Sequence, residues 1–277
     1  MSIEDPQNQT EKRKGSSLRL SVALESVMKF ATSKIEVKGR EHISEIPKGK
    51  KVIIVCSHIS DMDMGIAAYA LRDDFDLLIT HQSVQTLLEE PGISLGMKIA
   101  GKENFMPIDW LRFEGGKQGK FNPDNFIKLK KYLEESGKTP IIAAHNPSKR
   151  WQLKKGGYAA VMLAQLQGDA VILPIAIDVK SEEPVGMAES RLKTLKKKPE
   201  VEVSIGKPFE LPQIEGIKEL KPIFDKMKQN MPLSDEERKK FSELHQSLRD
   251  SSDMIMERLA EYLPKEKRGI YGKDNKK

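Results

Sequence analysis

The chain has 277 residues, and its 47 lysines and arginines exceed its 41 aspartates and glutamates, which gives a formal net charge of +6. This length is sufficient for one sizeable α/β domain with helical additions. A hydrophobic fraction of 38% beside a charged fraction of 32% is typical of a protein with a charged surface. The small positive excess favours anionic partners such as phosphates, lipid head groups or an acidic carrier protein, and it does not indicate a nucleic-acid-binding protein.

The cysteine count and the hydropathy pattern restrict the compartment. The single cysteine excludes an intramolecular disulfide, and no Cys/His cluster has the spacing of a metal site. No apolar run reaches about 18 residues, so we expect no transmembrane helix. Residues 1–15 are polar and lack the apolar core of a signal peptide. We therefore expect a cytoplasmic protein, with peripheral contact to the inner membrane face left open.

The chain begins with a polar segment, residues 1–16, that we expect to be a disordered tail. An amphipathic helix follows over residues 17–34, because apolar side chains recur there at helical spacing. Its other face is basic, so the helix is suited either to an anionic membrane surface or to docking on the protein's own core. The apolar positions are Leu20, Leu24, Val27, Met28 and Ala31, and the basic ones are Arg19, Lys29 and Lys34.

Strand and helix patterns then alternate over residues 35–210. We predict strands at 35–38, 51–57, 76–80, 139–144, 171–177 and 201–205, and helices at 62–72, 83–99, 123–136 and 155–167. Such alternation favours an α/β fold with a mixed, mostly parallel central sheet flanked by helices. In these folds ligands bind at the carboxyl ends of the strands.

The pattern becomes helical after Pro212, so residues 211–264 are predicted to be a C-terminal helical extension. Ser234 and Glu237 form a capping-box pattern that opens a long helix extending to about Tyr262. Pro264 ends that helix, and the lysine-rich residues 265–277 are expected to be a disordered basic tail.

The first chemically informative segment follows the strand at 51–57. His58 lies on the turn that leaves this strand, and Asp63 lies in the first turn of the next helix, for which Ser60 or Asp61 is the expected N-cap. A carboxylate in that place can return against the imidazole, so His58 is a candidate general base that Asp63 orients. The alternative is a histidine that caps a helix or is hydrogen-bonded in the core.

A second histidine stands five positions before an aspartate, at His245 and Asp250. Both lie within the predicted C-terminal helix, where five residues place side chains about 140° apart. We therefore expect these two residues to belong to a solvated helix face and not to contact each other.

Other residues near His58 carry weaker alternatives. Cys56 and Ser57 are conceivable nucleophiles, but adjacent side chains on a strand point to opposite faces. Asp61 and Asp63 form the Asp-x-Asp triplet of metal-dependent sugar transferases, but on a helix the two carboxylates diverge by about 200°. We predict no metal site.

Several separated segments, in order and spacing, resemble the PlsC-type glycerophospholipid acyltransferases, which include lysophosphatidic acid and glycerol-3-phosphate acyltransferases. His58 and Asp63 match the family's N-H-x-x-x-x-D block, and residues 145–149 align with its P-E-G-T-R block. The resemblance implies the PlsC-type fold over residues 35–210. The other matching segments are residues 35–43, 105–109, 153–158, 171–177 and 201–208.

The resemblance implies that an acyl group passes from acyl-CoA or an acyl carrier protein to the hydroxyl of a lipid acceptor, with no further cofactor, in phospholipid or glycerolipid biosynthesis. It assigns His58 and Asp63 to catalysis and the acceptor's phosphate to Asn146, Ser148, Lys149, Arg150 and Arg112. Three blocks depart from the family pattern. Ser57 replaces asparagine, Trp110 replaces arginine, and the phosphate block carries Asn146 and Lys149 in place of glutamate and arginine.

Lysine cannot make the planar two-pronged contact that arginine makes with phosphate. The sequence therefore leaves the acceptor open. It also leaves open a second class of function, a non-catalytic relative that binds lipid or an acyl carrier.

Overall fold

The computed structural model describes residues 15–60, 62–82, 97–108, 123–145, 152–180, 198–229 and 231–272. Most of the helix predicted at 83–99 lies outside these ranges, and so does the N-terminal segment up to residue 14. Within the described ranges no helix has both the length and the apolar character needed to cross a bilayer.

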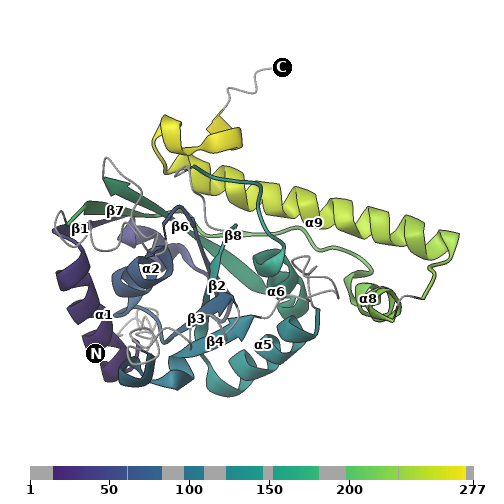
Figure 1. The fold of residues 1–277 in the computed structure, drawn as a ribbon, viewed down its shortest axis with the longest axis horizontal. Helices are drawn as coiled ribbons and strands as arrows, with labels where there is room; N and C mark the ends of the chain where they lie inside the picture. The colour runs from purple at the N-terminus through teal and green to yellow at the C-terminus, as the bar shows by residue number, and fades with distance from the viewer. Residues whose placement is uncertain are drawn as a thin grey trace, which may run out of the picture.

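A mixed, mostly parallel sheet forms the centre of the molecule, as the sequence predicts (Figure 1). Its strands lie in the order β1-β7-β6-β2-β5-β3-β4, with β8 beside β6. The strands from β6 to β4 are parallel, whereas β7 and β8 pair antiparallel with β6. Their bounds are β1 (Lys34–Lys38), β2 (Lys51–Cys56), β3 (Leu77–Gln82), β4 (Phe105–Ile108), β5 (Thr139–Ala143), β6 (Ala170–Lys180), β7 (Glu200–Ile205) and β8 (Phe209–Glu210).

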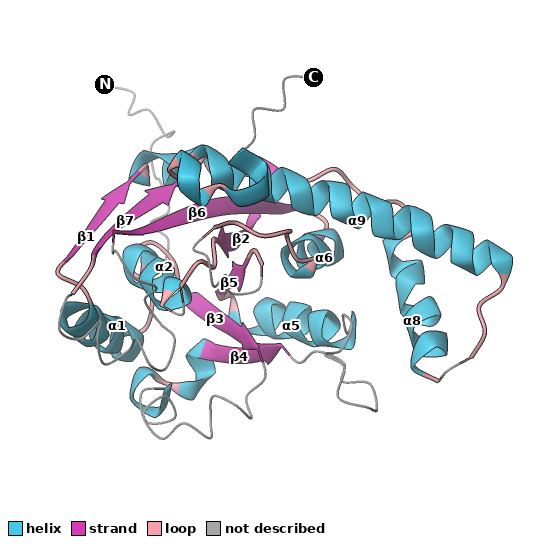
Figure 2. Cartoon of the chain, turned by 45° about the horizontal axis from the view of Figure 1, so that its top comes forward, coloured by secondary structure: helices cyan, strands magenta, loops and turns pink. Residues whose placement is uncertain are grey.

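Helices cover both faces of the sheet because its central strands are apolar on both sides. In β2, Ile53 and Val55 face one core, whereas Ile54 and Cys56 face the other. The first core is shared with α5, α6 and α9, and the second with α1 and α2, as Figure 2 shows. The helices are α1 (Leu18–Ala31), α2 (Asp63–Leu71), α5 (Pro123–Ser136), α6 (Ala159–Gln167), α8 (Leu220–Lys228) and α9 (Asp235–Glu261).

Helix α6 begins four residues later than predicted, at Ala159 instead of residue 155. Gly156, just before the helix, packs too closely against α9 to carry a side chain. A Cβ added to Gly156 would lie 2.3 Å from Ser252 Oγ and 2.7 Å from Met256 Cγ. The segment before α6 is therefore an irregular connection that packs against α9.

The N-terminal helix α1 docks on the protein's own core through buried Leu20, Leu24 and Met28. Its N-cap is Ser17, whose side chain accepts a hydrogen bond from the backbone N–H of Leu20. The methyl group of Met28 would lie 3.3 Å from a Cβ at Gly65, so α1 packs closely on α2. This docking uses only one face of the helix.

The C-terminal helix begins with the predicted capping box. Ser234 accepts from the backbone of Glu237, and the Glu237 carboxylate accepts from the backbone of Ser234. The structure corrects the disordered tail predicted after Pro264. Two 3-10 turns, Lys265–Lys267 and Gly269–Gly272, continue the fold.

These turns are held because they contact the segment before α6 and the sheet. The carbonyl of Lys267 accepts from Leu153 N at 2.9 Å, and the Lys267 ammonium binds Asp178 on β6. A Cβ at Gly269 would lie 2.0 Å from the carbonyl oxygen of Leu153, and Gly269 has a φ of 57° that favours glycine. The lysine-rich composition that suggested disorder therefore conceals specific contacts up to residue 272.

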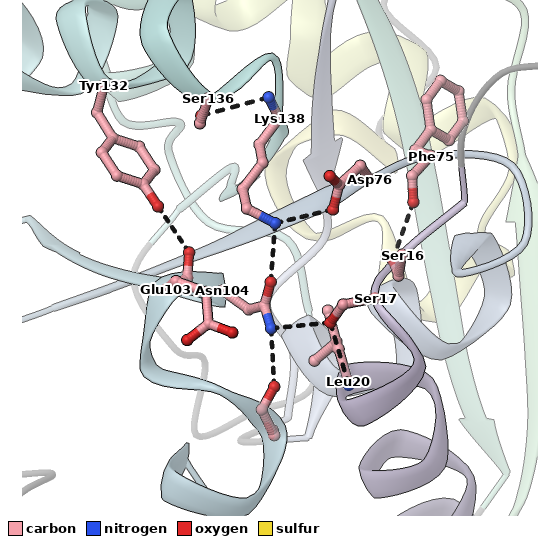
Figure 3. Close-up of polar contacts among 11 residues, drawn as sticks. Ser16, Ser17, Leu20, Phe75, Asp76, Glu103, Asn104, Tyr132, Ser136 and Lys138 are labelled. Carbon is pink, nitrogen blue, oxygen red and sulfur yellow. Dashed lines mark hydrogen bonds and ion pairs between the residues drawn. The ribbon is translucent and has the colours of Figure 1, made fainter.

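A buried amide joins three segments at the amino-terminal edge of the sheet (Figure 3). Asn104, fully buried, donates from Nδ2 to the Ala100 carbonyl at 2.7 Å and to Ser17 Oγ at 3.2 Å. Its Oδ1 accepts from Lys138 Nζ at 2.8 Å, and the same ammonium binds Asp76 at 2.8 Å. The network ties α1 to the starts of β3 and β5.

Replacing Asn104 by leucine should lower the free energy of unfolding by about 2–3 kcal/mol, because three polar groups at this buried site lose a hydrogen bond while the volume is kept. Urea unfolding followed by circular dichroism measures the loss. Gln246→Leu, an exposed amide on α9, is the matched control and should change stability by less than about 0.5 kcal/mol. Equal effects of the two substitutions would contradict the importance of the network.

Candidate active site

His58 lies directly beyond the carboxyl end of β2, the strand between β5 and β6. The preceding residue, Ser57, is fully buried and ties the turn to β6 through two hydrogen bonds. Its N–H donates to the Ile175 carbonyl at 3.0 Å, and its Oγ accepts from Ile177 N at 3.0 Å. Ser57 therefore fixes the start of the turn and is not placed as a nucleophile.

Asp63 is the first residue of α2 and has no exposed side-chain surface. Its Oδ2 accepts from the backbone N–H of Ser60 at 2.7 Å, and its Oδ1 accepts from the Ser60 hydroxyl. A carboxylate at a helix N-terminus is also favoured by the helix dipole. The turn thus holds the carboxylate in one place, on the side of His58.

The expected N-cap is corrected by this arrangement. The capping position is Met62, in a helical conformation and without a side-chain cap hydrogen bond. The Ser60 hydroxyl accepts a hydrogen bond from Met62 N at 3.3 Å and donates one to the Asp63 carboxylate. Asp61, the other expected N-cap, lies outside the described residues. The helix start is stabilised by its own first carboxylate instead of by the residue before it.

The imidazole of His58 and the carboxylate of Asp63 are adjacent, as the sequence predicts, but they do not form a hydrogen bond. His58 Nδ1 lies 3.8 Å from Asp63 Oδ2. Among the described residues this buried Nδ1 has no hydrogen-bond partner, while the side chain as a whole retains 16% exposure. A closure of about 1 Å would give the pair a normal hydrogen bond, and catalytic hydrogen bonds are often long before substrate binds.

A second imidazole adjoins this turn, and the sequence analysis did not single it out. His145 follows the carboxyl end of β5 and is 4% exposed. Its Nε2 accepts the backbone N–H of His58 at 3.3 Å. The strands bring the residues together because Ala144 N donates to the Cys56 carbonyl at 2.8 Å. The available signal was its position directly after an apolar strand, the same position as that of His58.

Cys56 is completely buried on the α2 side of β2, where its thiol contacts Met64 Sδ at 3.2 Å. Burial, and secondarily the negative charge of Asp63, raise the pKa of the Cys56 thiol well above its ordinary value of 9.0. A thiol that stays protonated and inaccessible is not a nucleophile. The residue belongs to the core.

The chain's single thiol should therefore react at least about 100-fold more slowly with Ellman's reagent in the native protein at pH 8 than in denaturant. Above pH 9.0 the unfolded chain loses the thiol proton, whereas the native protein keeps it because the pKa of Cys56 is raised. The free energy of unfolding should therefore fall as pH rises above 9.0. Comparing urea unfolding of wild type and Cys56→Ala at pH 8 and pH 10 measures that contribution. Rapid native labelling would contradict the assignment to the core.

His245 and Asp250 lie apart on α9, as the helical spacing predicts. The Asp250 carboxylate accepts from Gln246, and the imidazole of His245 lies 2.9 Å from the Tyr158 hydroxyl. His245 also contacts the edge of the Tyr158 ring, with centroids 5.3 Å apart. His245 is exposed, as expected for a solvated helix face, but it also contacts Tyr158.

The predicted acceptor residues Asn146, Ser148, Lys149, Arg150 and Arg112 lie outside the described residues, so their placement stays a prediction. The segment that follows them is held by α9. Arg249 donates to the Gly156 carbonyl at 3.2 Å, and Ser252 donates to the Gly157 carbonyl at 3.0 Å. Gly157 N in turn donates to the Ala144 carbonyl at 2.8 Å, beside His145.

Comparisons with known proteins give one named structural likeness. No family model and no curated protein matches the chain. Among solved structures, the 1-acyl-sn-glycerophosphate (LPA) acyltransferase PlsC from Thermotoga maritima aligns with a TM-score of 0.41 and 17% sequence identity, over 84% of this chain and 79% of that chain.

Proposed function

We propose that this protein is an O-acyltransferase that moves a fatty acyl group from a thioester to the hydroxyl of a phosphate-bearing or related lipid acceptor, in the manner of 1-acylglycerol-3-phosphate and glycerol-3-phosphate acyltransferases. One observation carries the proposal. A partly exposed imidazole, His58, stands at the carboxyl end of a central strand with the buried carboxylate of Asp63 3.8 Å from its Nδ1. A binding protein has no need for such a pair.

In the proposed reaction, Nε2 of His58 takes the proton of the acceptor hydroxyl while the hydroxyl oxygen attacks the thioester carbonyl carbon. The tetrahedral intermediate collapses with cleavage of the C–S bond, and the departing thiolate takes the proton from the imidazolium. The products are an oxoester and a free thiol. Because the thioester is already activated, no acyl-enzyme is needed.

Asp63 stabilises the imidazolium that forms in the transition state. The buried carboxylate attracts the developing charge more strongly than an exposed one, because water does not screen it. It also orients the ring by accepting from Nδ1–H, which leaves Nε2 directed to the acceptor. The two hydrogen bonds from Ser60 hold the carboxylate in place while the ring closes on it.

The donor is proposed to be acyl-CoA or an acyl carrier protein, and the acceptor's anionic head group is assigned to the segment between β5 and α6. This assignment rests on the resemblance of Asn146, Ser148, Lys149 and Arg150, with Arg112 after β4, to phosphate-binding blocks. Lysine and arginine suit an anionic group, and the hydroxyl of Ser148 adds a hydrogen bond.

A second candidate function is a non-catalytic relative that binds lipid or an acyl carrier. The 3.8 Å separation of His58 and Asp63 favours this alternative, since both oxygens of Asp63 already accept from Ser60. A pair that never closes would leave the imidazole without its orienting carboxylate.

Release of free thiol from an acyl thioester, measured with and without a hydroxyl acceptor, tests the enzyme directly. His58→Ala and Asp63→Asn should each lower acceptor-dependent thiol release by about 10²–10⁴, because each removes the positioned base or its orientation. His245→Ala is the control, a histidine on α9 that the mechanism does not use, and it should retain wild-type activity. Wild-type activity of His58→Ala would disprove the role of the base.

The acceptor is identified by running the same assay with lysophospholipids, glycerol phosphate and sugar lipids. Thiol release that requires one of these acceptors supports the transferase. Lipid or acyl-carrier binding by the wild-type protein without any thiol release supports the binding alternative.

We also propose that the outward face of α1 contacts an anionic membrane surface. The face opposite its buried stripe exposes apolar side chains, and basic groups border them. Lys198 Nζ donates to the Lys29 carbonyl at 2.9 Å and lies 5.9 Å from the centroid of the Phe30 ring. Apolar and basic groups together suit an anionic lipid surface. The exposed apolar residues are Leu18 (80%), Val22 (53%), Val27 (53%) and Phe30 (62%).

The double variant Val22→Ser/Phe30→Ser should bind vesicles of phosphatidylglycerol and phosphatidylcholine at least about tenfold more weakly than wild type, because it removes apolar area that the bilayer would bury. Cosedimentation at two salt concentrations measures binding and its electrostatic part. Met254→Ser/Ile270→Ser, which alters exposed apolar residues of α9 and of the last 3-10 turn, is the matched control. Equal losses in both variants would show that α1 is not the contact surface.

A further inference from the structure

The backbone of His58 is held by a side chain that the proposed mechanism does not use. The Nε2 atom of His145 accepts the His58 N–H at 3.3 Å, across 87 residues of sequence. The contact is possible because β2 and β5 pair in parallel, with Cys56 beside Ala143, so both histidines leave the same edge of the sheet. His145 is 4% exposed and is held in this position by the surrounding protein.

The backbone turn around His58 is held from three sides by separate partners. The side before the histidine is fixed to β6 by Ser57, and the side after it is fixed by the Ser60–Asp63 bonds. The N–H of His58 itself points to neither of these partners and is served by His145. The imidazole of His145 therefore accepts the hydrogen bond of the backbone N–H that belongs to the proposed base itself.

The direction of this hydrogen bond sets the tautomer of His145. An Nε2 that accepts a hydrogen bond carries no proton, so the hydrogen of the neutral ring is on Nδ1. The acceptor also lies at the far end of the side chain. As a substitute for His145, glutamine carries an acceptor oxygen at about the same distance from the backbone as Nε2. Leucine has a similar bulk but no acceptor.

We propose that His145 is a positioning residue for His58: it holds the turn so that the His58 ring meets both Asp63 and the acceptor hydroxyl. This inference rests on the proposed acyltransfer and deepens it. The P-E-G-T-R pattern to which residues 145–149 are compared has proline where this chain has His145, so the acceptor nitrogen is a property of this chain. Without it the turn rotates to satisfy its free N–H, and a displacement of about 1 Å at a reacting group costs about 10² in rate.

Steady-state kinetics of thiol release separates positioning from a general loss of structure. His145→Leu should lower kcat about 10- to 100-fold with the KM of the thioester within about twofold, and His145→Gln should recover most of kcat. His245→Gln, the same change at an exposed position, is the matched control and should leave both constants unchanged. Unchanged kcat in His145→Leu would overturn the proposal, and so would a His145→Gln protein as impaired as His145→Leu.

A nuclear magnetic resonance measurement on the wild-type protein decides the contact without any turnover. With ¹⁵N-histidine labelling, the ring nitrogens of His145 should report a protonated Nδ1 and an unprotonated Nε2, and the His58 amide should show a coupling to that Nε2 across the hydrogen bond. A protonated Nε2 in His145 would overturn the proposal even if His145→Leu failed to fold. Absence of transfer in wild type would instead count against the proposed function, while the spectrum would still decide the contact.

Discussion

The parallel pairing of β2 with its neighbours β5 and β6 is the constraint on which the rest of the site depends. Parallel strands end at a common edge, so the residues that follow them meet although they are far apart in sequence. His58 follows β2, His145 follows β5, and Ser57 binds the backbone of β6. Burial on both faces fixes the register of these strands, since a slip would turn apolar side chains to the wrong core.

At this edge the carboxylate of Asp63 is held by a residue only three positions away. Asp63 is completely buried, and burying such a group is costly unless hydrogen bonds compensate. Ser60 supplies them from its N–H and its hydroxyl. Both carboxylate oxygens are thus engaged within the turn. His58 Nδ1 stays 3.8 Å from Oδ2 and has no hydrogen-bond partner among the described residues.

The C-terminal helix α9 and the turns after it also stabilise the carboxyl edge of the sheet. Helix α9 and the turns that follow it hold the segment before α6 through Arg249, Ser252 and the Lys267 carbonyl. That segment is bonded to Ala144, at the end of β5. The extension therefore supports the carboxyl edge of the sheet from the side of β5, whereas Ser57 supports it from the side of β6.

Local pattern alone predicted much of this fold. The apolar run before His58 predicted β2, and the capping box at Ser234 predicted the start of α9, because each depends on neighbouring residues. Local pattern places Gly156 in a helix, whereas the close packing of Gly156 against α9 depends on residues about 100 positions away. The order after Pro264 was missed for the same reason: it depends on Leu153 and Asp178 and not on the composition of the tail.

The sequence by itself determined the alternation of strands and helices and the placing of His58 and Asp63 on one turn, because these follow from periodicity and from contacts a few residues long. The tertiary structure decided which strands are neighbours, and with that the meeting of His145 with His58, the burial of Cys56 and the engagement of both Asp63 oxygens. Strand order cannot be derived from local pattern, since the apolar strands are interchangeable in composition and only packing of the whole sheet distinguishes them.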